Sequence, residues 1–268
     1  MGIKDGWVGP GDASKVMDKE KDLNQPPEGE DLFEKPDWGK RAQEGFLASG
    51  IDSADRRGHK NYYIDLLQKM ALEEVLELKG DEFVLDFGCG SGRIAYWIAP
   101  RVKKVVGLEI TQEMIDLAEK NRTIGNVEFM LYDGVRFPVF PYPHDLILSV
   151  WVLQYMEGEI LKRIVHELTK YLKSGGRIYL IEQASDNLKM ERPKVREYLQ
   201  AFKESNLDCL KYYPIRNGRW WLLYLIRYGI IPKRFFSKIA QGEILHRRKE
   251  EKLISYYQDY LFVLKRDD

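Results

Sequence analysis

The chain has 268 residues, 44% of them hydrophobic, and its 42 basic and 42 acidic residues give a formal net charge of zero. This composition predicts a globular protein with a sizeable core, and its two cysteines are too few for a disulfide framework or a cysteine-based metal site. The longest apolar stretch, residues 220–231, is too short to cross a bilayer, and the first ten residues show no apolar targeting segment, so we expect a cytoplasmic protein without a metal.

Residues 1–60 are predicted to form an N-terminal arm or lid. Residues 1–30 are polar, are punctuated by Gly and Pro, and show no sustained apolar period. The aromatic-rich residues 38–46 could fold over the mouth of a site. From residue 61 to residue 78 apolar side chains recur at helical spacing, and Lys79-Gly80 ends the pattern, which predicts a helix leading into the core.

Strands and helices are expected to alternate in the central part of the chain. Short β-rich runs stand at residues 82–87, 104–109, 127–131, 145–150 and 177–182, and helical patterns stand at residues 92–99, 112–122 and 159–173. This alternation predicts βαβ units. The fold class is therefore α/β, with a doubly wound, mostly parallel sheet covered by helices on both faces.

The last hundred residues follow a different pattern. A helix is expected at residues 193–204, a strand at residues 207–215 and a final strand at residues 259–264. Between the two strands, residues 217–253 are predicted to form a helical insert that covers the substrate side of a site. The core of the protein then comprises residues 61–216 and 254–268.

Charge is distributed unevenly along this neutral chain. Residues 211–252 hold 11 Lys or Arg against three acids, whereas residues 1–55 hold 13 acids and seven bases. The basic segment also carries many aromatic residues, and one interpretation is that it faces a glycan, a lipid-linked saccharide or a membrane surface. The alternative is a solvated helical surface that pairs with the acidic N-terminal arm.

The residues 84–93 read VLDFGCGSGR, so an apolar run ends in an acid and then meets three glycines. Such a turn before a helix brings backbone N–H groups next to a ligand. The dinucleotide fingerprint G-x-G-x-x-G fails at Arg93, whereas the pattern G-x-G-x-G is satisfied by Gly88, Gly90 and Gly92. The Asp86 carboxylate would repel a pyrophosphate but suits a ligand with an ammonium and a sulfonium group, which describes S-adenosylmethionine.

Two further acids follow the next two strands. Glu109 ends its strand where a carboxylate can accept hydrogen bonds from both hydroxyls of a ribose. Asp133 follows the third strand, where a carboxylate can accept from the exocyclic amine of an adenine while an adjacent backbone N–H meets the ring. Together with the glycine turn, in this order and spacing, these acids favour an adenosine-containing cofactor.

These motifs resemble those of the class I S-adenosylmethionine-dependent methyltransferases, particularly the small-molecule branch called type 11. The resemblance covers residues 61–182 and is carried by VLDFGCGSGR, VVGLEITQEMIDLAEKN, DLILSVWVLQYM and LKSGGRIYLIEQ. It implies a Rossmann-like sheet of seven strands, with the last strand antiparallel, and S-adenosylmethionine as the cofactor. It also implies the following cofactor-site residues: Asp86, Gly88, Cys89, Gly90, Gly92, Glu109, Ile110, Met114, Asp133, Gly134, Ser149, Val150 and Gln154.

Methyl transfer is an in-line displacement, in which an enzyme mainly aligns a nucleophile and excludes water. A hydroxyl acceptor also benefits from a general base. Glu182, at the carboxyl end of a strand, is our first candidate for that base, with a structural salt bridge as its alternative role. His59 is the second candidate, if the segment before the first helix is a lid. Tyr155 is a third candidate catalytic residue, although many relatives have histidine in its position.

The sequence thus favours methyl transfer from S-adenosylmethionine to a hydroxyl of a small molecule or saccharide, with amines as alternative acceptors. One competing interpretation is an RNA methyltransferase. SVWVLQYM stands where amino-directed nucleic-acid enzymes carry an Asn-Pro-Pro-Tyr signature, and the net charge is neutral, so a nucleic-acid partner is not expected. Another is a non-catalytic module that retains the cofactor site. The sequence does not determine the oligomeric state.

Overall fold

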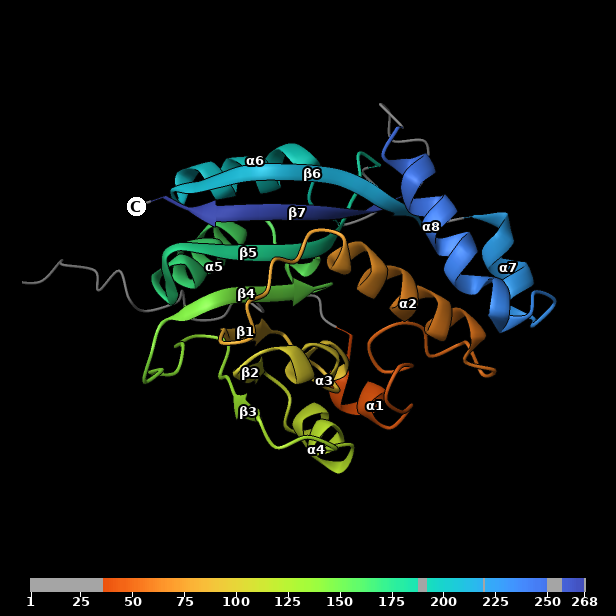
Figure 1. Cartoon of the computed structure of the whole chain (residues 1–268), viewed down its shortest axis with the longest axis horizontal. Coiled ribbons are helices and arrows are strands. Elements are labelled where there is room, and N and C mark those ends of the chain that lie inside the picture. Colours follow the sequence, from red (N-terminus) through yellow and green to blue (C-terminus); the bar gives the residue numbers. More distant parts are fainter. Residues whose placement is uncertain (1–35, 188–191, 219, 250–256, 268) are drawn as a thin grey trace, which may run out of the picture. The chain divides into compact units, whose positions relative to one another are not determined.

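The computed structural model describes residues 36–187, 192–218, 220–249 and 257–267. Its sheet has seven strands in the order β3-β2-β1-β4-β5-β7-β6 (Figure 1). The strands are β1 (Phe83–Phe87), β2 (Lys104–Glu109), β3 (Val127–Leu131), β4 (His144–Val150), β5 (Leu172–Ala184), β6 (Leu207–Asn217) and β7 (Gln258–Arg266). The helices are α1 (Trp38–Ala42), α2 (His59–Glu73), α3 (Arg93–Ile98), α4 (Gln112–Lys120), α5 (Gly158–Lys170), α6 (Val195–Glu204), α7 (Trp221–Arg227) and α8 (Phe236–Arg247), with short 3₁₀ turns η2 (Ala99–Arg101), η3 (Leu153–Tyr155) and η4 (Lys233–Phe235).

The pairing of the strands confirms the predicted fold class. β1 to β5 pair in parallel, and β7 is antiparallel to both of its neighbours, β5 and β6. From β1 the chain proceeds outward through β2 and β3, and it then returns to place β4 on the other side of β1. The strand order therefore reverses between β1 and β4, and in open α/β sheets ligands bind at the carboxyl ends of the strands at such a point.

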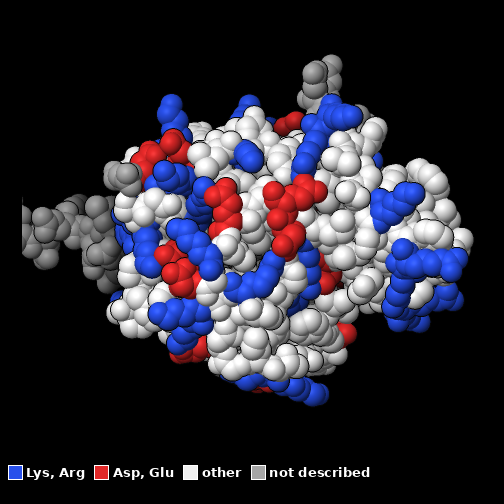
Figure 2. Space-filling view, in the orientation of Figure 1, with Lys and Arg blue, Asp and Glu red and all other residues white. Residues whose placement is uncertain are grey.

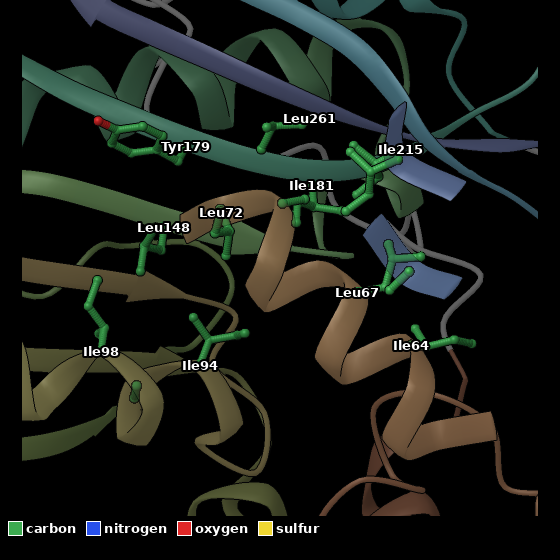
Figure 3. Packing of buried hydrophobic residues seen from close by; sticks show 14 of the residues in the cluster. Ile64, Leu67, Leu72, Ile94, Ile98, Leu148, Tyr179, Ile181, Ile215 and Leu261 are labelled. Carbon is green, nitrogen blue, oxygen red and sulfur yellow. The ribbon is translucent and has the colours of Figure 1, made fainter. Parts of the chain in front are cut away.

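The sheet separates two hydrophobic clusters because successive side chains of a strand point to opposite faces. Val84 of β1 belongs to one cluster and its neighbour Leu85 belongs to the other. The first cluster contains residues of α2, α3, α7 and α8, and Figure 3 shows Leu72 of α2 there with Ile181 of β5. The second contains residues of α5 and α6. Full burial of one such aliphatic side chain stabilises the fold by about 1.5–3 kcal/mol.

Helix α2 ends earlier than the predicted helix of residues 61–78. It ends at Glu73, and the chain that follows turns toward β1. The carboxylate of Glu82 accepts hydrogen bonds from the backbone N–H groups of Lys79 and Gly80, so these groups are satisfied without a helix. A side-chain carboxylate two and three residues further along thus replaces the helical hydrogen bonds that the apolar pattern predicts.

Strand β5 begins at Leu172, five residues before the predicted start at residue 177, and α5 accordingly ends at Lys170. Leu172 is buried and pairs with His144 of β4 ahead of a register shift. A Cβ on Gly176 would lie 2.8 Å from Leu172 Cγ, so a side chain there would not fit. Pairing with β4 therefore extends the strand over a glycine-containing stretch that has little strand propensity.

The helical insert before the last strand is confirmed by α7 and α8, which pack against α2 (Figure 1). Leu223 and Ile226 of α7 are buried, as are Phe236 and Ile244 of α8. The Phe236 ring meets the Tyr63 ring of α2 edge to face, with the ring centroids 5.6 Å apart. Part of the insert is therefore an extension of the hydrophobic core.

Candidate active site

A cavity lies at the carboxyl ends of β1, β2 and β4, where the strand order reverses. Together with the open solvent at its mouth it spans about 1050 Å³ of space that protein atoms do not fill, and we call it the cofactor cavity. Nine of the residues predicted to bind the cofactor line it: Asp86, Gly88, Cys89, Gly90, Glu109, Ile110, Met114, Gly134 and Val150.

The glycine turn needs glycine at Gly88 and at Gly90 for different reasons. Gly88 has a φ of +68°, and a Cβ on it would lie 2.3 Å from Val152 Cγ2, so the turn and the loop after β4 leave no room for a side chain. Gly90 has a φ of +53°, and no atom lies within 4 Å of the position of its Cβ, so this backbone borders open space. Gly92 does not line the cavity but precedes the first residue of α3.

Asp86 is the most unusual group of the cavity. Its side chain is 2% exposed, and its Oδ2 atom is buried without a hydrogen-bond partner. Burial raises the pKa of Asp86 to about 7, against the opposing effect of the Arg93 guanidinium. A buried carboxylate oxygen without a partner is costly, and a ligand with N–H groups or a positive charge would remove that cost. The site therefore fits the amino-acid portion of S-adenosylmethionine.

Glu109 ties the glycine turn to the end of β2. Its Oε2 accepts a hydrogen bond from the Gly90 N–H at 3.0 Å, and its Oε1 accepts from the N–H groups of Ile110 and Thr111. Burial raises the pKa of Glu109, and these three hydrogen bonds oppose that rise. The carboxylate oxygens keep lone pairs for further donors. Its contact with a ribose stays a prediction.

The structure does not bring Asp133 into the cavity lining, although its neighbours Tyr132 and Gly134 line it. Asp133 is exposed, and its Oδ1 accepts hydrogen bonds from the N–H groups of Val135 and Arg136. These bonds lower its pKa. Asp133 thus shapes the loop after β3, and its contact with an adenine stays a prediction.

The loop after β4 contains a strained residue that the sequence did not reveal. Trp151 lines the cofactor cavity and has a φ of +63°, in the left-handed region that non-glycine residues rarely adopt. Its N–H donates to the Ile181 carbonyl at 2.8 Å. Such a conformation costs about 1–3 kcal/mol and persists only where the surroundings enforce it.

Glu182 supplies that enforcement from β5. Its Oε1 accepts from the Ser149 hydroxyl and from the Val152 N–H, both at 3.2 Å, and its Oε2 accepts from the Gln154 N–H at 3.1 Å. Glu182 is fully buried and does not line the cavity, and burial raises its pKa to about 7. This placement favours a positioning role over proton transfer, and the role of general base stays a prediction.

The remaining predicted residues are dispersed. Ser149 is buried beneath the loop and lines no described cavity, whereas Gln154 lines a neighbouring one. His59 is the first residue of α2 and lies against Gly229, since a Cβ on Gly229 would be 2.8 Å from its ring; it lines neither cavity. Tyr155 lines both cavities, and its ring meets that of Trp38 edge to face at 5.7 Å.

The segment at residues 38–50 reaches the cofactor cavity. Trp38 and Gly50 line it, and the Ser91 hydroxyl of the glycine turn donates to the Phe46 carbonyl at 2.6 Å. The sequence drew attention to these aromatic residues without identifying their contacts. By contrast, no described residue between 218 and 249 lines the cofactor cavity or its neighbour, and the covering role of the insert stays a prediction.

The neighbouring cavity, which we call the basic cavity, shares Gly50, Trp151 and Tyr155 with the cofactor cavity. Its lining includes four cationic residues, Arg41, Lys60, Arg192 and Arg216, and no carboxylate. Three of these cations have acidic partners outside the lining: Arg41 lies 3.9 Å from Glu44, Lys60 contacts Asp52 at 2.6 Å, and the buried Arg216 forms a two-pronged ion pair with Asp259. Cationic side chains therefore line this cavity next to the cofactor cavity.

Comparisons with known proteins agree with this geometry. A protein family described as a methyltransferase domain matches residues 84–176. Phosphoethanolamine N-methyltransferase 3 of Arabidopsis thaliana is 29% identical over 140 residues, which are 47% of this chain and 28% of that protein. Malonyl-[acyl-carrier protein] O-methyltransferase of Hamiltonella defensa is 27% identical over 183 residues, which are 63% of this chain and 69% of that protein.

The fold is also that of solved structures. An S-adenosylmethionine-dependent methyltransferase from Mesorhizobium loti superposes with a TM-score of 0.55 and 14% identity, covering 75% of this chain and 98% of the other. The matched family spans β1 to the start of β5, which is the part of the sheet that forms the cofactor cavity. Residues 84–176 are therefore a methyltransferase domain, and the sheet around them has the fold of S-adenosylmethionine-dependent methyltransferases.

Proposed function

We propose that this protein transfers the methyl group of S-adenosylmethionine to a hydroxyl or amine of a small, polar acceptor, saccharides included. The observation that carries the proposal is the junction of two cavities at Trp151 and Tyr155. One cavity has the carboxylates and the glycine turn that suit the methyl donor. The other is polar and adjoins it, as an acceptor site must if the two reactants are to meet.

The donor side is built from fixed groups. When bound, S-adenosylmethionine supplies an electrophilic methyl group on a sulfonium. Asp86, Glu109 and the backbone around Gly90 would hold it, since they combine buried acceptors with open backbone. Glu182 holds the backbone of the loop that carries Trp151, so the wall between the two cavities is set before any ligand binds.

The acceptor side favours a molecule with an anionic group, such as a phosphate or a carboxylate. The four cations of the basic cavity face no carboxylate in its lining, and guanidinium groups recognise both anions through paired hydrogen bonds. The plant relative described above carries phosphoethanolamine in its name, and a phosphorylated amine has the charge and the nucleophile that this cavity suits. Tyr155 is the titratable side chain that borders both cavities.

The experiment is a methyl-transfer assay with radiolabelled S-adenosylmethionine. Acceptors are offered in matched pairs that differ in one group: an amine or sugar with and without a phosphate, and one with and without a carboxylate. We expect transfer to the charged member of a pair. Preferred transfer to the uncharged members would refute the acceptor class, transfer to RNA would favour the competing enzyme, and cofactor binding without any transfer would favour a binding module.

A further inference from the structure

The surface of α7, η4 and α8 exposes an unusual number of large apolar side chains. Twelve such residues are exposed among the described residues, and six of them lie between residues 221 and 245. These six are Trp221, Tyr224, Tyr228, Ile230, Phe235 and Leu245, and together with the cations beside them we call this region the α7–α8 surface. Exposed apolar residues that gather in one region mark an interaction site, whereas isolated ones do not.

Helix α7 is apolar on both of its sides. Leu223 and Ile226 are buried on one side, in the hydrophobic cluster that they share with α2. Trp221, Tyr224 and Tyr228 recur at intervals of three and four residues, so they lie along the other side, where they are 67%, 58% and 61% exposed. A surface helix of a globular protein normally presents polar residues on its outer side. The outer side of α7 therefore suits contact with another apolar surface.

The charges beside these aromatic residues have one sign. Lys233, Arg234 and Lys238 are exposed, and Figure 2 shows blue and white surface where α7 and α8 lie. The one acid in residues 220–249 is Glu243, which is 4% exposed and accepts a hydrogen bond from the Tyr63 hydroxyl. It thus contributes no negative charge to the surface.

We propose that the α7–α8 surface docks on the surface of an anionic lipid bilayer. Trp and Tyr prefer the boundary between lipid headgroups and acyl chains, and lysine and arginine beside them attract anionic headgroups. A second copy of the chain fits less well, because a symmetric interface would place these cations against each other. Contact would be peripheral, since none of the described helices is long and apolar enough to span a membrane.

The first test is co-sedimentation of the full-length protein with vesicles. We expect binding to vesicles of phosphatidylcholine mixed with phosphatidylglycerol, little binding to phosphatidylcholine alone, and weaker binding at high salt. The variant Lys233→Gln with Arg234→Gln should bind about fivefold more weakly for each charge removed, which follows from about 1 kcal/mol per basic residue near such a surface. Equal binding to both kinds of vesicle, or none to either, would overturn the proposal.

The second test separates the apolar contribution and controls for folding. Replacing Trp221, Tyr224 and Ile230 together by Ser should abolish vesicle binding, whereas Val139→Ser, which changes a side chain that is 91% exposed elsewhere, should not. Both variants should bind S-adenosylmethionine as the unmodified protein does, because none of these residues lines the cofactor cavity. Unchanged vesicle binding by the triple variant would refute the docking surface. If the unmodified protein is a dimer and the triple variant is a monomer that still binds vesicles, the surface is instead a contact between two copies of the chain.

Discussion

Gly88 and Val152 approach so closely that a Cβ on the glycine would lie 2.3 Å from Val152 Cγ2. Gly88 belongs to the turn after β1, and Val152 to the loop after β4, whose backbone Glu182 holds. Two of the loops that line the cofactor cavity are thus in contact through a position without a side chain. Changes to either loop should therefore affect cofactor binding as well as stability.

The variants Gly88→Ala and Gly90→Ala should separate these two effects. Alanine at position 88 must displace Val152, so we expect a loss of several kcal/mol of stability together with loss of cofactor binding, the range found for overpacking plus backbone strain. Alanine at position 90 meets no protein atom but borders the cavity, so it should weaken S-adenosylmethionine binding with a stability loss of only about 1 kcal/mol. Calorimetry measures cofactor binding, and thermal unfolding measures stability. Gly125→Ala, which meets nothing and lacks a positive φ, serves as the control.

Cofactor affinity should depend on pH through Asp86. Its pKa is raised to about 7 without ligand, so below pH 7 the carboxyl is largely protonated and must lose its proton to pair with a cationic ligand. The affinity for S-adenosylmethionine should rise with pH up to about 7 and then level off. Titration calorimetry in buffers of different ionisation enthalpy measures the released proton. In Asp86→Asn the affinity should be low and nearly independent of pH; a pH dependence that survives this substitution would show that another group is responsible.

Replacement of Glu182 distinguishes positioning from proton transfer. Glu182→Gln keeps the size of the side chain but cannot accept all three hydrogen bonds, so the loop carrying Trp151 should loosen and kcat should fall about 10- to 100-fold. If Glu182 only positions the loop, the pH profile of kcat keeps its shape. If it is the general base, the fall in rate on the acidic side of the profile should disappear in the variant.

The stability of the protein should decrease between about pH 4.5 and pH 7. Burial raises the pKa of Glu243 from 4.5 to about 7, so within this window the native state retains a proton that the unfolded chain has released. Each rise in pH then favours the unfolded chain, and the effect ends above pH 7. The raised pKa values of Asp86 and Glu182 change the stability in the same direction, and their effect also ends at about pH 7.

The variant Glu243→Gln isolates one part of this dependence. Urea unfolding at several pH values gives the slope of the unfolding free energy against pH. Between pH 5 and pH 7 this slope should be smaller in the variant by the equivalent of up to one proton, whatever the change in absolute stability. Glu119→Gln is the matched control, because the Arg122 hydrogen bond lowers the pKa of Glu119 and keeps its titration below the window. An unchanged slope in Glu243→Gln would mean that Glu243 is ionised throughout.

Local patterns predicted the elements that local forces determine. The bounds of β2 and β3 agree with the predicted strands because both are short apolar runs between clear turn signals. The acid and glycines around Asp86 were recognisable because one continuous stretch holds them. The left-handed backbone of Trp151 was not, since Glu182, 31 positions later in the sequence, supports it. The basic cavity was equally hidden, because its cations come from four separate segments.

The ion pair of Arg216 and Asp259 also has a consequence for how the sheet assembles. The two residues are register partners in the antiparallel pairing of β6 with β7, and both side chains are almost fully buried. A shift of one residue would send alternate side chains to the opposite face and separate two buried charges, at a cost of about 3–5 kcal/mol. The ion pair therefore fixes the register of β6 with β7. Only the register that keeps this ion pair leaves Arg216 in the wall of the basic cavity.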